Sequence, residues 1–420
     1  MAVTNFTFRR AFSLFLCISL CIVLFSLPPI ALADSFPIIG TLHVGERPEA
    51  LAVDLQTHML YIADEFPGVI VGFDPIRGIV RWRVSVGNTA TDVQVDSTSH
   101  HVYATTTSFN TQQSVLFILD GATGHLLFTT PVAFGDNAIV LDAQRQRLYV
   151  AGPESGVIDA FSFLSGWQSG PIHLTSVQLH LGPHPQGLGV NTRLGRLYVA
   201  DAATHLITVF DEGTGRVLAT VPVAAGPLQP LRVDETTGYV YIVCSTGREL
   251  DILDGKTNRV IVHTPVAPDP EGIAFHTATG RIYIADEGDD HTIGTTITIL
   301  DGQTFDVLGT LPVGRSPDGV EADPALHRVY VSTEDSNAVV EISDSVDLPL
   351  TSGASTYQSI AAHRAIDALQ QATTVTLIGM CLAIIGATLY ALLPRWRARG
   401  SLQTQPGDVP SLPEQDTPLP

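Results

Sequence analysis

Short apolar and β-branched runs recur along the chain, and turn residues such as Gly, Asp and Thr separate them. Seven of these runs contain a tyrosine, and successive tyrosines are 42, 46, 49, 43, 42 and 47 residues apart. They are Tyr61, Tyr103, Tyr149, Tyr198, Tyr241, Tyr283 and Tyr330. A period in the forties built from strand-like segments is typical of a β-propeller, with one four-stranded blade per repeat.

The fourth repeat predicts four short strands, at residues 185–191, 196–201, 206–211 and 216–221. Turn residues bound these apolar and β-branched segments, as an antiparallel meander requires. Gly213 and Gly215 mark the last turn, because glycine accepts positive φ without steric cost. The repeat therefore predicts one blade of a propeller.

One polar position recurs ten residues after the start of every repeat, where the first strand ends. It holds Asp54, Asp96, Asp142, Asn191, Asp234, His276 and Asp323. Asp and Asn side chains bond their own backbone in turns. We therefore interpret this position as turn chemistry and not as a catalytic feature.

The seventh repeat ends near residue 344 without an outer strand. At the other end of the chain, Ile39–Val44 closely matches Leu308–Val313, the outer strand of the sixth repeat. We therefore predict that the N-terminal segment completes the seventh blade and leaves no large unpaired edge. The predicted fold class is all-β: a seven-bladed β-propeller at residues 34–347, its last blade closed by an N-terminal strand, plus one C-terminal transmembrane helix.

The N-terminal end has the pattern of an export signal. Residues 1–33 combine Arg9 and Arg10, an apolar core and a small-x-small site before Asp34, which predicts a signal peptide. An uncleaved anchor helix is the alternative.

The C-terminal end has the pattern of a membrane anchor. Residues 372–393 contain no charge over 22 positions, long enough for a transmembrane helix, and three arginines follow within 394–399. The arginines favour the cytoplasmic side. We expect a juxtamembrane linker at 348–371 and a short disordered cytoplasmic tail at 394–420. The expected localisation is the cell membrane, single-pass, with the propeller outside the cytoplasm. Leu348–Ser352 imperfectly resembles a cell-wall sorting signal, which leaves wall anchoring as an alternative.

Charge and cysteine content narrow the function classes. The formal net charge is −20 and no basic patch is present, so nucleic-acid binding is disfavoured. Cys244 is the one cysteine of the predicted propeller, so that domain holds no internal disulfide, and its apolar run predicts a small core residue. The sequence has no Cys-x-x-Cys-His, Gly-x-Ser-x-Gly or His-Glu-x-x-His motif.

The repeats resemble the YVTN β-propeller family, which includes surface-layer and exported bacterial proteins. The segments that match are Leu60–Asp64, Leu197–Asp201, Ile282–Asp286 and Val329–Ser332, with turns such as Asp211–Gly215. The resemblance covers about residues 37–344. It implies a seven-bladed fold and, for the function, mostly binding or surface roles.

A second polar position lies five residues before each strand-ending position and should form a ring at the mouth of the central channel. It holds Glu49, Thr91, Asn137, Gln186, Gln229, Glu271 and Asp318. The three carboxylates come from repeats six, seven and one, which are neighbours in a closed ring. Such a cluster suits Ca²⁺ or another divalent cation, or a general base for lactone or ester hydrolysis. A solvated channel lining is the alternative.

The loops after the second strands add further acid, and we expect them to rim the same face. They contain Asp64, Glu65, Asp201, Asp286, Glu287, Glu334 and Asp335. The densest segment, 286–291, includes Asp286, Asp289, Asp290 and His291 and forms a candidate metal loop. A hydrophilic loop that carries solvated charge is the alternative. His184 lies near the mouth as a further candidate base.

The leading function is a binding or interaction platform at the acidic face, which can depend on a cation. The expected partner is an envelope or extracellular protein, or a small ligand. A lactonase-like hydrolase using Glu49, Glu271 and Asp318 is one alternative, and a structural surface protein is the other. No cofactor other than Ca²⁺ or a similar divalent cation is expected.

Overall fold

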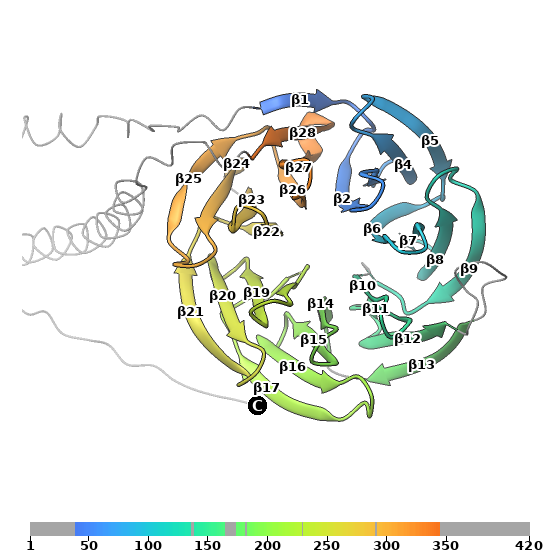
Figure 1. The fold of residues 1–420 in the computed structure, drawn as a ribbon. Helices are drawn as coiled ribbons and strands as arrows, with labels where there is room; N and C mark the ends of the chain where they lie inside the picture. The colour runs from blue at the N-terminus through green and yellow to red at the C-terminus, as the bar shows by residue number, and fades with distance from the viewer. Residues whose placement is uncertain are drawn as a thin grey trace, which may run out of the picture. The chain divides into compact units, whose positions relative to one another are not determined.

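A computed structural model of the chain describes residues 38–135, 138–163, 174–180, 183–228, 230–289 and 292–344. Within these ranges the strands form seven four-stranded antiparallel sheets, arranged as blades around a central axis (Figure 1). The all-β, seven-bladed fold is thereby confirmed. None of the described residues forms a helix with the length and apolar character that a membrane crossing requires. The expected signal peptide, linker, transmembrane helix and tail lie outside the described residues.

The first four blades follow each other along the chain, each running from the inner strand to the outer strand. Blade 1 holds β2 (Pro48–Val53), β3 (Leu60–Asp64), β4 (Val69–Asp74) and β5 (Ile79–Ser85). Blade 2 holds β6 (Thr89–Asp96), β7 (His101–Ser108), β8 (Gln113–Asp120) and β9 (Leu126–Val132). Blade 3 holds β10 (Ile139–Asp142), β11 (Arg147–Gly152), β12 (Val157–Phe163) and β13 (Leu174–His180). Blade 4 holds β14 (Pro185–Asn191), β15 (Arg196–Asp201), β16 (Leu206–Asp211) and β17 (Val217–Pro222), close to its predicted strands.

The last three blades complete the ring. Blade 5 holds β18 (Arg232–Asp234), β19 (Tyr239–Cys244), β20 (Glu249–Asp254) and β21 (Arg259–Pro265). Blade 6 holds β22 (Pro270–His276), β23 (Arg281–Asp289), β24 (Thr292–Asp301) and β25 (Val307–Pro312). Blade 7 holds β26 (Pro317–Asp323), β27 (Arg328–Thr333) and β28 (Ala338–Ser343), with the short 3₁₀ turn η1 (Glu334–Ser336) between the last two.

The fourth strand of blade 7 comes from the start of the described chain. Strand β1 (Ile38–Leu42) pairs antiparallel with β28, with Thr41 opposite Val340 and Leu42 opposite Val339. Figure 1 shows β1 in blue beside β28 in orange, the two ends of the colour scale. The predicted closure of the last blade is therefore confirmed, and β28 is not left as an open edge.

The periodic tyrosines lie on the second strand of each blade and are buried. Each is at most 3 % exposed to solvent. Tyr61 stacks on Trp82 with ring centroids 5.7 Å apart, and the Trp82 indole N–H donates to the carbonyl oxygen of Gly121 in blade 2 at 2.9 Å. The repeat period therefore marks packing between blades. Cys244 is also fully buried, as expected for a core residue.

The polar position at the end of each inner strand organises the turn that follows. In every blade its side chain accepts a hydrogen bond from a backbone N–H two or three residues later. Asp54 and Asp323 also bind a histidine of the next blade, His100 and His58, each with 2.7 Å between the carboxylate and Nδ1. Turn chemistry at this position is confirmed, and two of its members join blades as well.

Candidate functional site

A repeated backbone contact builds one face of the propeller. In three adjacent blades, the glutamate four residues after the buried tyrosine of the second strand donates its N–H to the carbonyl oxygen of the residue before the inner strand. These contacts are Glu65 to Arg47 at 2.8 Å, Glu287 to Asp269 at 3.1 Å and Glu334 to Ser316 at 2.9 Å. The contact places the three glutamates at equivalent positions of blades 1, 6 and 7. They therefore lie around one sector of the mouth.

The same three blades carry the acidic members of the predicted ring. Glu49, Glu271 and Asp318 occupy the second position of β2, β22 and β26. Blade 4 holds Gln186 at the second position of β14, and blade 2 holds Thr91 at the third position of β6. Asn137 and Gln229 lie outside the described residues. We call these six carboxylates and Asp269 the acidic mouth. Its negative charge is confined to one sector of the ring, as the sequence predicted from blade order.

The densest part of the acidic mouth is a group of three carboxylates from blade 6. One oxygen each of Asp269, Glu271 and Glu287 lies within 4.8 Å of the other two. Burial, reinforced by Asp318, Glu287 and Asp269, raises the pKa of Glu271 well above its ordinary value. Burial and the charges of Glu334 and Asp269 raise the pKa of Glu287 to about 7. The arrangement disfavours ionised carboxylates unless a cation joins them.

Arg47 compensates part of this charge from blade 1. Its guanidinium donates to Glu334 and lies 3.1 Å from the Glu65 carboxylate. A Ca²⁺ ion takes six to eight oxygen ligands from carboxylates, carbonyls and water. The group of Asp269, Glu271 and Glu287 supplies oxygens only, so its chemistry fits Ca²⁺ better than a transition metal.

The channel below the mouth is narrow. A cavity of about 50 Å³ is lined by Glu49, Thr91, Asp318 and Arg232, among others. That volume holds a few water molecules and is far below the roughly 300–1,000 Å³ of pockets for small organic ligands. The Arg232 guanidinium donates to Glu321 and to the Ile273 carbonyl oxygen, at 2.8 Å for the latter, and so links blades 5, 6 and 7. A ligand of this face would bind at the mouth and not inside the channel.

Several predicted rim residues are buried in the fold. Asp286 is 2 % exposed and accepts hydrogen bonds from the hydroxyls of Thr296 and Thr298 at 2.8–2.9 Å. Burial raises its pKa to about 7. Asp64 and Asp201 are also buried, and each accepts a backbone N–H. The expectation that these aspartates rim the mouth is wrong, because alternate side chains of a strand point to opposite faces.

Most of the segment 286–291, which was predicted to be a metal-binding loop, belongs to a strand. Strand β23 continues to Asp289 and β24 begins at Thr292, so the segment is largely a strand extension. Asp290 and His291, like the side chain of Asp289, lie outside the described residues. His184 is exposed, and its backbone N–H donates to the Asp201 carboxylate at 3.3 Å.

Arg47 and Asp269 are mouth residues that the sequence analysis did not single out. Both immediately precede the proline that begins an inner strand, as Ser316 does in blade 7. That shared placement before proline was a usable signal. It is weak, however, because the residue types at this position differ from blade to blade.

Comparison with known proteins supports the fold alone. No protein-family profile matches the chain, and no curated protein matches it. Among solved structures, the β-propeller domain of Cps50 (Swd1) from Myceliophteria thermophila is similar, with a TM-score of 0.61 and 10% identity over 74% of this chain and 99% of that one. Hydrazine synthase of Kuenenia stuttgartiensis has a TM-score of 0.60 and 16% identity over 73% and 98%. The resemblance to the YVTN family stays a prediction.

Proposed function

We propose that this protein is a membrane-anchored, extracytoplasmic interaction platform whose acidic mouth binds Ca²⁺, and through it a partner. One observation carries the proposal: three carboxylates of blade 6 lie within 4.8 Å of one another, and further acidic side chains surround them. Export and anchoring rest on the sequence patterns at residues 1–33 and 372–393. Membership of the YVTN family, whose members are mostly binding or surface proteins, is part of the same proposal.

The lactonase-like alternative has one favourable feature. Glu271, whose pKa is raised, meets one requirement of a general base. The cavity that Glu49 and Asp318 line, about 50 Å³, is too small to enclose an organic substrate. A larger hollow of about 360 Å³ lies between blades 1 and 2 beside Glu65, but it is not lined by Glu49, Glu271 or Asp318. Binding is therefore the better supported function for these carboxylates, and a screen of lactones and esters for turnover tests the alternative.

The test is calcium binding by the full-length protein, measured by calorimetry and by thermal unfolding with chelator and with Ca²⁺. Glu271→Gln and Glu287→Gln should each weaken binding at least about tenfold, because each removes a ligand charge. Glu154→Gln is the control, since Glu154 is an exposed carboxylate in blade 3. Unchanged affinity in both mouth variants, or no calcium binding, would overturn the proposal.

The pH dependence gives a second readout. The pKa of Glu287 is about 7 in the folded protein and near 4.3 in an unfolded chain. Between these values the folded state binds more protons, so the stability contributed by Glu287 is lost as the pH rises toward 7. Unfolding curves without calcium should therefore show a steeper fall in stability from pH 5 to pH 7 for the wild type than for Glu287→Gln. Added Ca²⁺ should reduce that difference.

A further inference from the structure

A second group of metal-type side chains lies away from the mouth, on the outer hairpin of blade 5. Glu249 and Asp251 alternate along β20, so both side chains point to the same face. His263 on β21 lies directly opposite Asp251 in the antiparallel register. A bulge between Ile252 and Leu253 sets this register. Without it, Val262 would oppose Asp251 and His263 would point to the other face.

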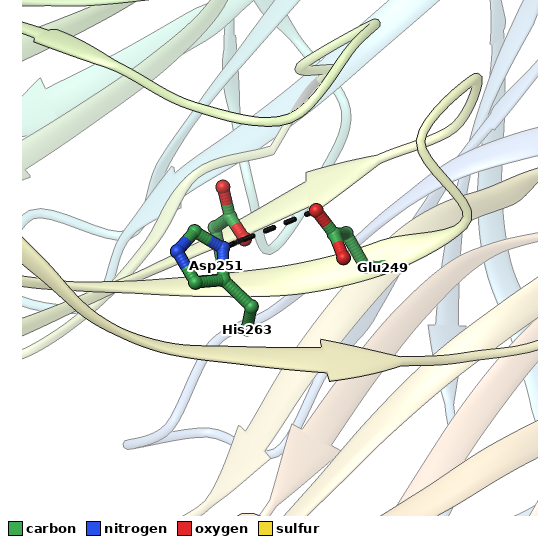
Figure 2. A group of neighbouring side chains, drawn as sticks. All are labelled: Glu249, Asp251 and His263. Atoms are coloured by element: carbon green, nitrogen blue, oxygen red, sulfur yellow. Dashed lines mark hydrogen bonds and ion pairs between the residues drawn. The ribbon is translucent and has the colours of Figure 1, made fainter.

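The three side chains converge on a small volume (Figure 2). His263 Nδ1 lies 2.6 Å from Asp251 Oδ1 and 3.9 Å from Glu249 Oε1. All three ligand atoms lie within 4.8 Å of one another. Two ligands on one tetrahedral Zn²⁺ are about 3.3 Å apart, given bonds of roughly 2.0–2.1 Å. The 2.6 Å contact is a hydrogen bond between His263 and Asp251, which an ion bound to both atoms would replace. The 3.9 Å separation lies above the value for two ligands of one ion.

One side chain of this group is buried, and the other two are accessible to solvent. The Asp251 side chain is fully buried, and its Oδ2 accepts the Ala224 N–H at 2.8 Å. Buried carboxylates are paired with a cation or coordinate a metal. The His263 side chain is 58 % exposed and that of Glu249 27 %. An ion can therefore enter from solvent and keep a position open to water.

Blade 3 provides an internal comparison. Asp159 occupies the position of Asp251 and accepts the Ala133 N–H in the same way. Its cross-strand neighbour is Gln178, and Val157 stands where blade 5 has Glu249. An aspartate at this position can thus accept the hydrogen bond from the backbone N–H of the segment before the inner strand without a neighbouring histidine or glutamate. Blade 5 carries both in addition.

We propose that Glu249, Asp251 and His263 form a binding site for a divalent transition-metal ion, with Zn²⁺ as the probe. One imidazole nitrogen and two carboxylates favour Zn²⁺ over Ca²⁺, which prefers oxygen ligands. The ion would take the lone pair of His263 Nδ1, and the ring proton would then reside on Nε2. The site would link β20, β21 and, through Asp251, the linker at Ala224. It is independent of the calcium site proposed at the mouth.

The experiment is titration of Zn²⁺ into the full-length protein, purified without a histidine tag, by calorimetry and thermal unfolding. The wild type should bind Zn²⁺ and melt at a higher temperature with it. His263→Gln and Glu249→Gln should each weaken binding at least about tenfold. Asp251 is left intact because it also holds the Ala224 N–H.

Two controls separate this site from the rest of the molecule. His125→Gln removes an exposed histidine in blade 2, and Glu287→Gln changes the acidic mouth. Both should keep wild-type Zn²⁺ affinity, while circular dichroism checks that every variant is folded. Absence of Zn²⁺ binding would mean that Asp251 and His263 are joined by their hydrogen bond only. That result, or equal affinity in His263→Gln and the wild type, would overturn the proposal.

Discussion

The hydroxyl group of a recurring tyrosine contacts a turn of the next blade. The Tyr198 hydroxyl of blade 4 reaches the turn that follows β20 in blade 5. A Cβ placed on Gly255 in that turn would lie 2.5 Å from this hydroxyl and 2.5 Å from the carbonyl oxygen of Gly238. Blade 4 has Glu212 at the corresponding place, and the Tyr149 hydroxyl donates to its carboxylate at 3.1 Å. In these two blades the position therefore holds either no side chain or one that accepts the tyrosine hydroxyl.

Gly255→Ala should lower the free energy of unfolding by about 1–3 kcal/mol, because the added methyl group has no space beside a backbone oxygen. Urea unfolding measures the change. Gly309→Ala on β25 is the matched control, since a Cβ there has no neighbour within 4 Å. We expect the control to be neutral or slightly stabilising. Equal effects of the two substitutions would contradict this account of the tyrosine contact.

Strand pairing decides the closure of the ring and the register of the outer hairpins. Bulges or register shifts in the pairing of the third and fourth strands occur in blades 1, 2, 4, 5, 6 and 7. Each bulge shifts the outer strand by one residue and so exchanges the faces to which its side chains point. Strand β1 adds the closing element, and its Leu42 packs against the core cluster that includes Val339 and Val44.

A chain that begins at residue 45 should melt at least about 5 °C lower than one that begins at residue 36, because it lacks β1 and exposes the edge of β28. Differential scanning calorimetry measures the change in melting temperature. We also expect the shorter chain to self-associate through the free edge, which sedimentation can detect. Equal melting temperatures and a monomeric short chain would show that β1 is dispensable for closure.

Across the whole propeller, charge is distributed unevenly around the axis. Carboxylates gather at the mouth on blades 6, 7 and 1, while Arg232 of blade 5 meets Glu321 of blade 7 in the channel. Burial raises the pKa of Glu321, and the nearby Arg232 opposes that shift. The ion pair therefore connects blades that are not adjacent in the ring.

Arg232→Met should destabilise the protein by about 3 kcal/mol, because Glu321 and the Ile273 carbonyl oxygen lose their partner. The double variant Arg232→Met/Glu321→Leu should recover most of that loss, since the buried Glu321 charge, which would otherwise be unpaired, is then removed. Chemical denaturation of both variants measures the coupling. If the double variant is less stable than Arg232→Met alone, the channel pair stabilises the propeller through contacts other than charge.

The sequence by itself determined the number of blades, the closure by an N-terminal strand and the turn chemistry at positions such as Asp54. These features repeat at fixed spacing or act within a few residues, so linear order is enough to find them. The order of the repeats in the sequence also predicted that Glu49, Glu271 and Asp318 lie on adjacent blades. Only the tertiary structure decided which acidic side chains meet. The Asp286 side chain is buried and accepts hydrogen bonds from two threonine hydroxyls. The Asp269 carboxylate, in contrast, lies close to those of Glu271 and Glu287 at the mouth. His263 faces Asp251 because of one bulge, and a shift of one residue in register is not visible in local sequence pattern.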